Sequence, residues 1–278
     1  MSPKGPLSIS KAKPKDLSQI RAVAFDIDDT FSSEGKITSE AFQALWKLHK
    51  KGYILVPVTG RPAGWCDHIA RFWPVHAVVG ENGAFCLFQT PTKKKGEIGK
   101  LRRIETPGAI TDEALRKKKL RELADQIIFR FPDAKFASDQ NYRDHDLAID
   151  FCEDVPAWPE ADVNALLELC HKQGAHAKLS SIHVNTWFGD YDKWAGFTNL
   201  LNHTQAWAPA KTLKWIGNLD HWIFLGDSPN DEPMFAKFKT SAAMANLKPW
   251  LSRLKNYPTY LATKKSGAGF VEVTGKLK

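Results

Sequence analysis

Short runs of apolar residues along this chain are followed by clusters of acidic and hydroxyl side chains. Residues 22–25, 53–58 and 222–225 each form a run of strand length that consists mainly of apolar side chains. A short continuous apolar run is typical of a strand buried on both faces of a parallel sheet. The pattern therefore predicts a parallel sheet that contains these strands.

Helical stretches connect the runs in the first third of the chain. One helix is predicted from the N-cap residue Thr38 to Gly52, and another over residues 62–72, with Pro62 in its first turn. A third strand is predicted at 77–79, and the tight-turn sequence Asn82-Gly83 then returns the chain over 84–88. This alternation of strands and helices predicts right-handed crossovers between parallel strands.

The pattern changes between about residue 90 and residue 187, where Lys-rich and Pro-containing loops separate helical stretches from short strands. Helices are predicted at 112–130 and 158–173, and strands at 147–151 and 182–187. The predicted fold class is α/β, with a Rossmann-like parallel-sheet core and an inserted α+β cap domain. The expected boundaries are a disordered lead-in at 1–16, a core formed by 17–89 and 188–278, and a cap at 90–187.

The composition is that of a soluble globular protein. The chain has 278 residues, of which 43% are hydrophobic and 25% charged. It contains no apolar stretch of membrane-spanning length, and residues 1–16 lack the apolar core of a signal peptide. A cytoplasmic location is therefore expected. The four cysteines form no CxxC pair, which favours buried thiols over a disulfide or a zinc site.

A net charge of +8 leaves several kinds of anionic partner open. Basic residues cluster at 93–95 and at 116–119. The second cluster lies in a predicted helix whose apolar face carries Leu115, Leu120, Leu123 and Ile127. A solvent-exposed helix face is the simpler interpretation of this cluster, and a polyanion-binding patch is the alternative.

The acidic residues after the first strand suggest phosphoryl transfer. Asp26 and Asp28 are two residues apart at a strand end, so both side chains are expected to face one cavity. One carboxylate can attack an electrophile while the other transfers the proton of the leaving group. Taken alone, Asp-x-Asp also fits a turn, whereas a calcium EF-hand is a poor fit because Phe31 replaces the required glycine.

The ends of two further strands supply the remaining groups. Asp227 and Asp231 follow the strand at 222–225, and Thr59-Gly60 follows the strand at 53–58. Carboxylates are ligands for Mg²⁺, and a threonine with nearby backbone N–H groups can hold phosphate oxygens, with a lysine to complete the site. In open α/β sheets, ligands bind beyond the carboxyl ends of the strands. One shared site is therefore predicted.

These segments resemble the haloacid dehalogenase (HAD) superfamily of hydrolases. The motif Asp-x-Asp-x-Thr matches residues 26–30, Thr59 matches the second motif, Asp192-Lys193 the third, and residues 226–231 the acidic fourth. The position of the insert, between motifs two and three, is similar to that in subclass IIB. This subclass includes sucrose and trehalose phosphate phosphatases and eukaryotic phosphomannomutases. The string at 226–234 looks most similar to that of mannosyl-3-phosphoglycerate phosphatases.

The resemblance implies a role for each matched residue. Asp26 is the expected nucleophile, which forms an aspartyl-phosphate, and Asp28 the expected general acid/base. Mg²⁺ is expected on Asp26, the backbone carbonyl of Asp28, Asp227 and Asp231. The expected phosphate-binding residues are Thr59, Gly60, Lys193 and Asn230. Asp29 and Phe31 depart from the family pattern, which commonly has glycine and leucine there.

Candidate substrate residues lie mainly on one predicted strand of the cap. Ser181, His183, Asn185 and Trp187 alternate along it, so they are expected on one face, although a solvent-facing surface is an alternative. Arg61 is a candidate for binding a second anionic group, or else a surface arginine at a helix start, and Asn82 is a further candidate. Trp65 and Trp187 are the tryptophans expected nearest the cleft.

The sequence thus predicts an Mg²⁺-dependent phosphatase for a small phosphorylated metabolite. The expected substrates are sugar phosphates or phosphorylated glycosides. A phosphomutase is the alternative enzyme. A third hypothesis is a non-catalytic basic module that binds nucleic acid. The complete set of acidic residues at the strand ends and the lack of an RNA-binding motif argue against it. No nucleic-acid or membrane partner is expected, and the sequence leaves the oligomeric state open.

Overall fold

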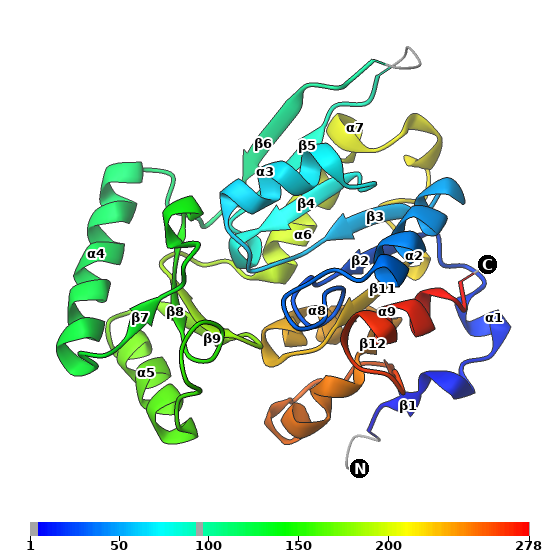
Figure 1. The fold of residues 1–278 in the computed structure, drawn as a ribbon. Helices are drawn as coiled ribbons and strands as arrows, with labels where there is room; N and C mark the ends of the chain where they lie inside the picture. The colour runs from blue at the N-terminus through cyan, green and yellow to red at the C-terminus, as the bar shows by residue number, and fades with distance from the viewer. Residues whose placement is uncertain (1–4, 93–96, 278) are drawn as a thin grey trace.

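A computed structural model describes residues 5–92 and 97–277 (Figure 1). Its central sheet has six strands in the order β1-β13-β12-β11-β2-β3, and each neighbouring pair is parallel. In that order the strands are Leu7–Ser8, Tyr260–Leu261, Ser241–Ala243, Trp222–Gly226, Ala22–Phe25 and Ile54–Pro57. The predicted parallel α/β sheet is therefore confirmed.

Helices cover both faces of this sheet, as the continuous apolar strands require. Val23 and Phe25 of β2 lie in one apolar cluster with residues of α2 and α9, whereas Ala22 and Ala24 lie in another with residues of α6 and α8. The helices of the core are α1 (Pro14–Leu17), α2 (Ser39–Lys50), α3 (Ala63–Phe72), α6 (Lys193–Asn202), α7 (Thr204–Trp207), α8 (Glu232–Lys237) and α9 (Ser266–Thr274).

The third predicted strand leads into a small antiparallel sheet. β4 (Ala77–Gly80) continues the large sheet through a parallel bridge between Val58 and Val79, and it pairs with β5 (Phe85–Gln89) across the predicted turn. β6 (Leu101–Glu105) pairs with β5. β6 therefore packs with the core. We propose that the insert begins after residue 109, later than the boundary expected at residue 90.

The remaining elements form a second layered unit, drawn in green in Figure 1. Its antiparallel sheet has the order β7-β8-β10-β9, in which the strands are Lys135–Phe136, Asp146–Asp150, His183–Trp187 and His176–Leu179. Helices α4 (Glu113–Arg130) and α5 (Glu160–Lys172) pack on it through a separate apolar cluster. Both helices lie where the sequence predicts them, whereas β7 and β9 were not predicted. We call this unit the cap.

Two expectations differ from the structure. Residues 5–16 were expected to be disordered, but β1 pairs with β13 at the sheet edge and Ile9 is buried under the core. A two-residue strand and one apolar anchor are too short to give a periodic signal. In the 116–119 cluster, Arg116 is buried and donates to the carbonyls of Asp144 and Ile110, while Leu115 is 45% exposed. The cluster at 93–95 lies outside the described residues.

The last two observations concern the cysteines and the length of the apolar helices. Cys66, Cys86 and Cys170 are buried and Cys152 is half-buried, and all four are free thiols, as the sequence predicts. Within residues 5–92 and 97–277, no helix has both the length and the apolar character that crossing a membrane requires.

Candidate active site at the carboxyl end of the sheet

The predicted site residues converge because β11, β2 and β3 are neighbours in the sheet. Asp26 and Asp227 directly follow β2 and β11, Thr59 follows β3 after one further residue, and all three are buried. Lys193 is the first residue of α6. The N-cap residue of this helix, Asp192, accepts a hydrogen bond from the N–H of Ala195. The sheet order thus brings together segments that are far apart in the sequence.

Lys193 lies at the centre of the acidic cluster. Its Nζ donates to Asp26 Oδ1 at 2.8 Å, to Asp231 Oδ1 at 2.7 Å and to Asn230 Oδ1 at 3.3 Å. Burial alone would lower the pKa of Lys193, but Asp231 and Asp26 raise it above its ordinary value. The ammonium group therefore remains charged in the interior.

The carboxylates outnumber this cation. Burial raises the pKa of Asp26 to about 7, against the effect of Lys193, and burial together with Asp26 raises that of Asp227 well above its usual range. Oxygen atoms of Asp26, Asp227 and Asp231 lie within 4.8 Å of one another. Closely spaced buried carboxylates are the hard oxygen donors that Mg²⁺ prefers. The donor set therefore fits a divalent cation of this class.

Asp231 is more constrained than its neighbours. Its Oδ1 accepts from Lys193, and its Oδ2 accepts from the backbone N–H groups of Asp227 and Ser228, at 2.9 and 3.3 Å. Both oxygens therefore already hold the loop after β11 in place. Asp227 instead accepts from the Thr30 hydroxyl at 2.9 Å and from Asn246 Nδ2 at 2.8 Å.

The second predicted motif lies beside this cluster. The Thr59 hydroxyl accepts a hydrogen bond from the N–H of Arg61 at 3.0 Å, which leaves its own proton free to be donated. Gly60 lines the cavity next to Asp26, and a Cβ atom there would lie 3.1 Å from the Asn82 side chain. Asn82 itself has φ = 55° and directs its Nδ2 toward Asp146 of the cap, at 3.4 Å.

Asp28 is held by Arg61 rather than standing free. Arg61 Nε and Nη2 both donate to the Asp28 carboxylate, at 2.8 to 3.0 Å, and Nη1 and Nη2 also reach Asp139 and Glu153, both at 3.2 Å. Because Asp139 and Glu153 belong to the cap, Arg61 joins the cap to the loop that follows β2. It is a buried arginine, not a surface residue at a helix start.

Most of the candidate substrate residues face Asp26 and Asp28 across a narrow cavity. Ser181, His183 and Asn185 line it, and the space left is about 10 Å³, enough for about one water molecule. Trp187 does not line it, because its ring stacks on Tyr191 and its Nε1 donates to the Tyr191 carbonyl. Trp65 is 45% exposed and lies against the Arg61 guanidinium.

Both departures from the family pattern have a structural reason. Asp29 has φ = 52°, in the left-handed region where glycine is most favourable and aspartate is tolerated better than most residues. Phe31 is fully buried and packs edge-on against Phe270, with ring centroids 4.9 Å apart. Neither residue displaces a group of the acidic cluster.

Sequence reasoning missed several residues of the site. Asn246 follows β12, another strand of the same sheet, so the rule that found Asp227 also predicts it. Glu81 is fully buried, and its carboxylate accepts from the backbone N–H groups of Ala63 and of cap residues 144–146. Arg143 of the cap donates to the Gly60 carbonyl at 2.9 Å. No local signal distinguishes Glu81 or Arg143.

Residues 23–109 match the family model of haloacid dehalogenase-like hydrolases. No curated protein matches the chain. Several solved structures share its fold at low identity. The trehalose-6-phosphate phosphatase C-terminal domain of C. albicans has a TM-score of 0.69 at 14% identity, covering 100% of this chain and 99% of that one.

Two further structures agree over nearly the whole chain. A Thermoplasma acidophilum protein has a TM-score of 0.66 at 16% identity, with 93% of this chain and 98% of that chain covered. The Synechocystis sucrose-phosphatase, solved with sucrose and phosphate, has a TM-score of 0.59 at 15% identity, with 94% and 98% covered. Residues 23–109 are therefore similar to the haloacid dehalogenase-like hydrolases, and the chain as a whole shares its fold with these solved structures.

Proposed function

We propose that the protein is an Mg²⁺-dependent phosphatase that hydrolyses a small phosphorylated metabolite, a sugar phosphate or phosphorylated glycoside, through an aspartyl-phosphate. One observation carries this proposal. Asp26, Lys193 and Asp227 meet at the carboxyl end of the sheet, with the Thr59 hydroxyl beside them. A structural ion-pair network does not require this surplus of buried acid over base.

The first half of the reaction belongs to Asp26 and Asp28. A carboxylate oxygen of Asp26 attacks phosphorus, the bond from phosphorus to the leaving-group oxygen breaks, and Asp28 gives that oxygen a proton. Lys193 and the Thr59 hydroxyl bind the oxygens of the transferring phosphoryl group and offset its charge. Asn230 and Gly60 line the same space.

The second half regenerates the carboxylate. Asp28 now accepts a proton from a water molecule, which attacks the phosphorus of the aspartyl-phosphate, and the bond to Asp26 breaks as inorganic phosphate forms. Arg61 binds the Asp28 carboxylate in this structure, so the proposed proton transfer includes a shift of Asp28 away from the arginine. Asp139 and Glu153 already lie at hydrogen-bonding distance to keep the arginine in place after that shift.

The residues that would hold Mg²⁺ are Asp26, the backbone carbonyl of Asp28, and Asp227, with Asp231 in support. When bound, the ion would neutralise the charge that develops on the phosphoryl oxygens. Asn246 and Thr30 orient the Asp227 carboxylate through their hydrogen bonds. Asp231 acts mainly by fixing Lys193 and the loop of Asp227.

The sugar-phosphate class is supported by two kinds of finding. The cavity walls from the cap are polar, with Ser181, His183 and Asn185 facing Asp26. In addition, two proteins of the same fold are named as a sucrose-phosphatase and a trehalose-6-phosphate phosphatase.

The test is phosphate release from a panel of phosphorylated sugars, polyols and nucleotides, with Mg²⁺ and with a chelator. The Asp26→Asn variant serves as control, after circular dichroism shows that it is folded. Release that needs Mg²⁺ and is lost in the variant supports the phosphatase. If folded wild-type protein with Mg²⁺ releases no phosphate from any compound, the proposal fails. Isomerised product without free phosphate would instead indicate a phosphomutase.

A further inference from the structure

A second cavity, of about 270 Å³, adjoins the narrow one at Asp26. It lies between the loop after β2 and the cap, and it shares Asp28, Arg61 and Ile182 with the narrow cavity. If phosphate binds at Asp26, the rest of the substrate must pass Asp28 and enter this larger space. The walls of this outer pocket therefore face the leaving group of the proposed reaction.

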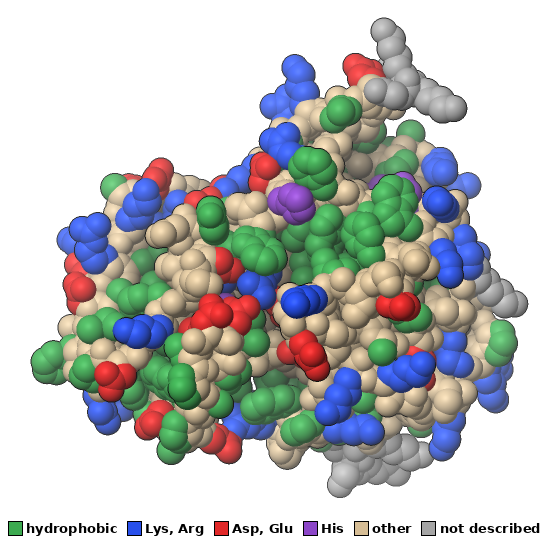
Figure 2. Space-filling view, viewed as in Figure 1, with side chains coloured by type: hydrophobic (Ala, Val, Ile, Leu, Met, Phe, Trp, Pro, Cys, Tyr) green, Lys and Arg blue, Asp and Glu red, His purple; other side chains and the backbone are tan. Residues whose placement is uncertain are grey.

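The outer pocket is strongly acidic. Its lining carries the four carboxylates of Asp28, Asp29, Glu34 and Glu153 and the guanidinium of Arg61. Figure 2 shows acidic side chains gathered at the boundary between the cap and the core. Because the pocket is partly closed by protein, these charges are screened less than they would be on an open surface.

Arg61 does not offset this charge for a substrate. Its side chain is 8% exposed, and it already pairs with Asp28, Asp139 and Glu153 at 2.8 to 3.2 Å. A further anion would have to displace one of these carboxylates from Arg61, and it would meet the negative charge of the carboxylates that remain. Arg61 is therefore poorly placed to receive a second anionic group, contrary to the expectation from sequence.

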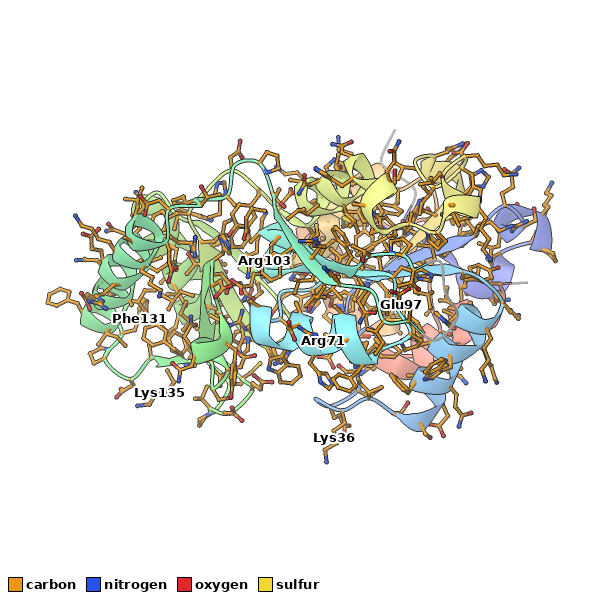
Figure 3. The ribbon with its side chains drawn as sticks, turned by 90° about the horizontal axis from the view of Figure 1, so that it is seen from above. Lys36, Arg71, Glu97, Arg103, Phe131 and Lys135 are labelled. Carbon is orange, nitrogen blue, oxygen red and sulfur yellow. The ribbon has the colours of Figure 1, made fainter. Side chains whose placement is uncertain are left out.

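Three other basic side chains near the outer pocket either already face a carboxylate or point away from the protein. Arg143 is 1% exposed in its side chain and pairs with Asp139 and Asp146. His183 Nε2 lies 2.8 Å from a carboxylate oxygen of Glu153, so this ring nitrogen already faces an acidic partner. Lys36, near the loop tip, points away from the body of the protein in Figure 3.

We propose that the outer pocket selects by charge, accepting leaving groups that are neutral or cationic and excluding those that carry a second negative charge. Glu153 and Asp29 are the specificity residues, because they face the leaving group from the cap and from the core. Carboxylates accept hydrogen bonds from hydroxyl and ammonium groups but repel another carboxylate. This inference rests on the proposed function, since it assumes that phosphate binds at Asp26.

Three hexose-derived phosphates test the selection, because they differ mainly in charge away from the phosphate. They are glucose 6-phosphate, glucosamine 6-phosphate and 6-phosphogluconate. We expect kcat/KM for 6-phosphogluconate to be lower than for the other two by about 10-fold or more, because like charges meet in the pocket. Raising the salt concentration should narrow the gap. Equal or better use of 6-phosphogluconate would overturn the inference.

Two variants test whether the outer pocket causes the lower kcat/KM for 6-phosphogluconate. Glu153→Gln removes one charge with little change of shape and should raise the use of 6-phosphogluconate relative to glucose 6-phosphate several-fold. Glu122→Gln is the matched control, because Glu122 is an exposed residue of α4 on the cap whose side chain pairs only loosely with Lys118, at 3.9 Å. An unchanged ratio in Glu153→Gln, or an equal change in both variants, would contradict the assignment.

A binding measurement separates this inference from the phosphatase proposal. Calorimetric titration of the Asp26→Asn protein with the same three compounds, in the presence of Mg²⁺, requires no turnover. The same order of affinities is expected, with 6-phosphogluconate weakest. If no compound releases phosphate from wild-type protein but this order holds, the phosphatase proposal fails and charge selection stands. Equal or absent binding of all three compounds overturns charge selection.

Discussion

Lys193 Nζ lies 2.8 Å from Asp26 Oδ1 and 2.7 Å from Asp231 Oδ1, and the lysine side chain is 1% exposed. Because a buried cation is paired with two buried carboxylates, the stability of the folded protein depends on all three charges being present. Removing one partner of such a group is costly, because it leaves the other charges without compensation.

Lys193→Met should therefore lower the free energy of unfolding, by about 3–5 kcal/mol, because Asp26 and Asp231 remain buried without their cation. Urea unfolding in the presence of a chelator measures this difference. Lys193→Arg keeps the charge and should lose less. A methionine variant as stable as the wild-type protein would contradict the view that the lysine balances the acidic cluster.

Asn246 should affect metal affinity without touching a phosphate. Its Nδ2 donates to Asp227 Oδ2 at 2.8 Å and to the carbonyl of Asp29 at 3.1 Å. Asn246→Ala leaves the Asp227 carboxylate less well oriented, so the apparent Kd for Mg²⁺ should rise about 10- to 100-fold. Calorimetric titration with MgCl₂ tests this directly.

The control for that experiment is Asn256→Ala. Asn256 is exposed, and its N–H and Nδ2 donate to Glu232 rather than to Asp26, Asp227 or Asp231. It should leave the Mg²⁺ affinity unchanged. Unchanged affinity in folded Asn246→Ala protein would show that Asn246 does not orient a metal ligand.

How far the sequence predicts this site depends on which rule places each residue. Asp26, Thr59 and Asp227 follow apolar strands, and the sheet topology alone brings such positions together. Glu81 and Arg143 meet the cap or the core only because the two units dock in one particular way, and hydrophobic periodicity carries no information about docking. Alternation along β10 predicts a shared face for His183 and Trp187. The ring of Trp187 instead stacks on Tyr191 within an apolar cluster.

Glu81 is predicted to fix the cap on the core. Its carboxylate oxygens accept from the N–H groups of Ala63 and of residues 144–146, mostly at 2.9 to 3.1 Å. Glu81→Gln turns an amide N–H₂ group toward these donors, so the free energy of unfolding should fall by about 1–3 kcal/mol. Amide hydrogen exchange at 144–146 should become faster. Exchange as slow as in the wild-type protein would contradict an anchoring role.

His76 should make the fold acid-sensitive. Burial, with smaller contributions from His49 and Lys211, lowers the pKa of His76 to about 4, and its Nδ1 accepts from the N–H of Leu55. The unfolded chain binds a proton below about pH 6.5, but the folded protein does not until about pH 4. Unfolding therefore takes up a proton in this window, and stability falls as the pH falls, by at most about 1.4 kcal/mol per pH unit from this group.

Urea unfolding at pH 7 and pH 5 measures that loss. His76→Asn keeps a hydrogen-bond acceptor near Leu55 but does not titrate, so its stability should change less between the two pH values. His68→Asn alters an exposed histidine and should behave like the wild-type protein. An equal loss in wild-type and His76→Asn protein would show that another group causes the acid sensitivity.

The hydrogen bond between Thr30 and Asp227 joins residues separated by 197 positions, and the ion pair between Asp26 and Lys193 spans 167. During translation, Asp26 and Asp28 leave the ribosome long before the lysine that balances them. Until Lys193 is synthesised, the carboxylates of Asp26 and Asp28 have no buried lysine to balance their charge. The last strand of the cap ends at Trp187, just before Lys193, so most of the cap is synthesised before the ion pair can form. A nascent chain that stops before Asn246 therefore contains Asp26 but lacks part of the proposed site.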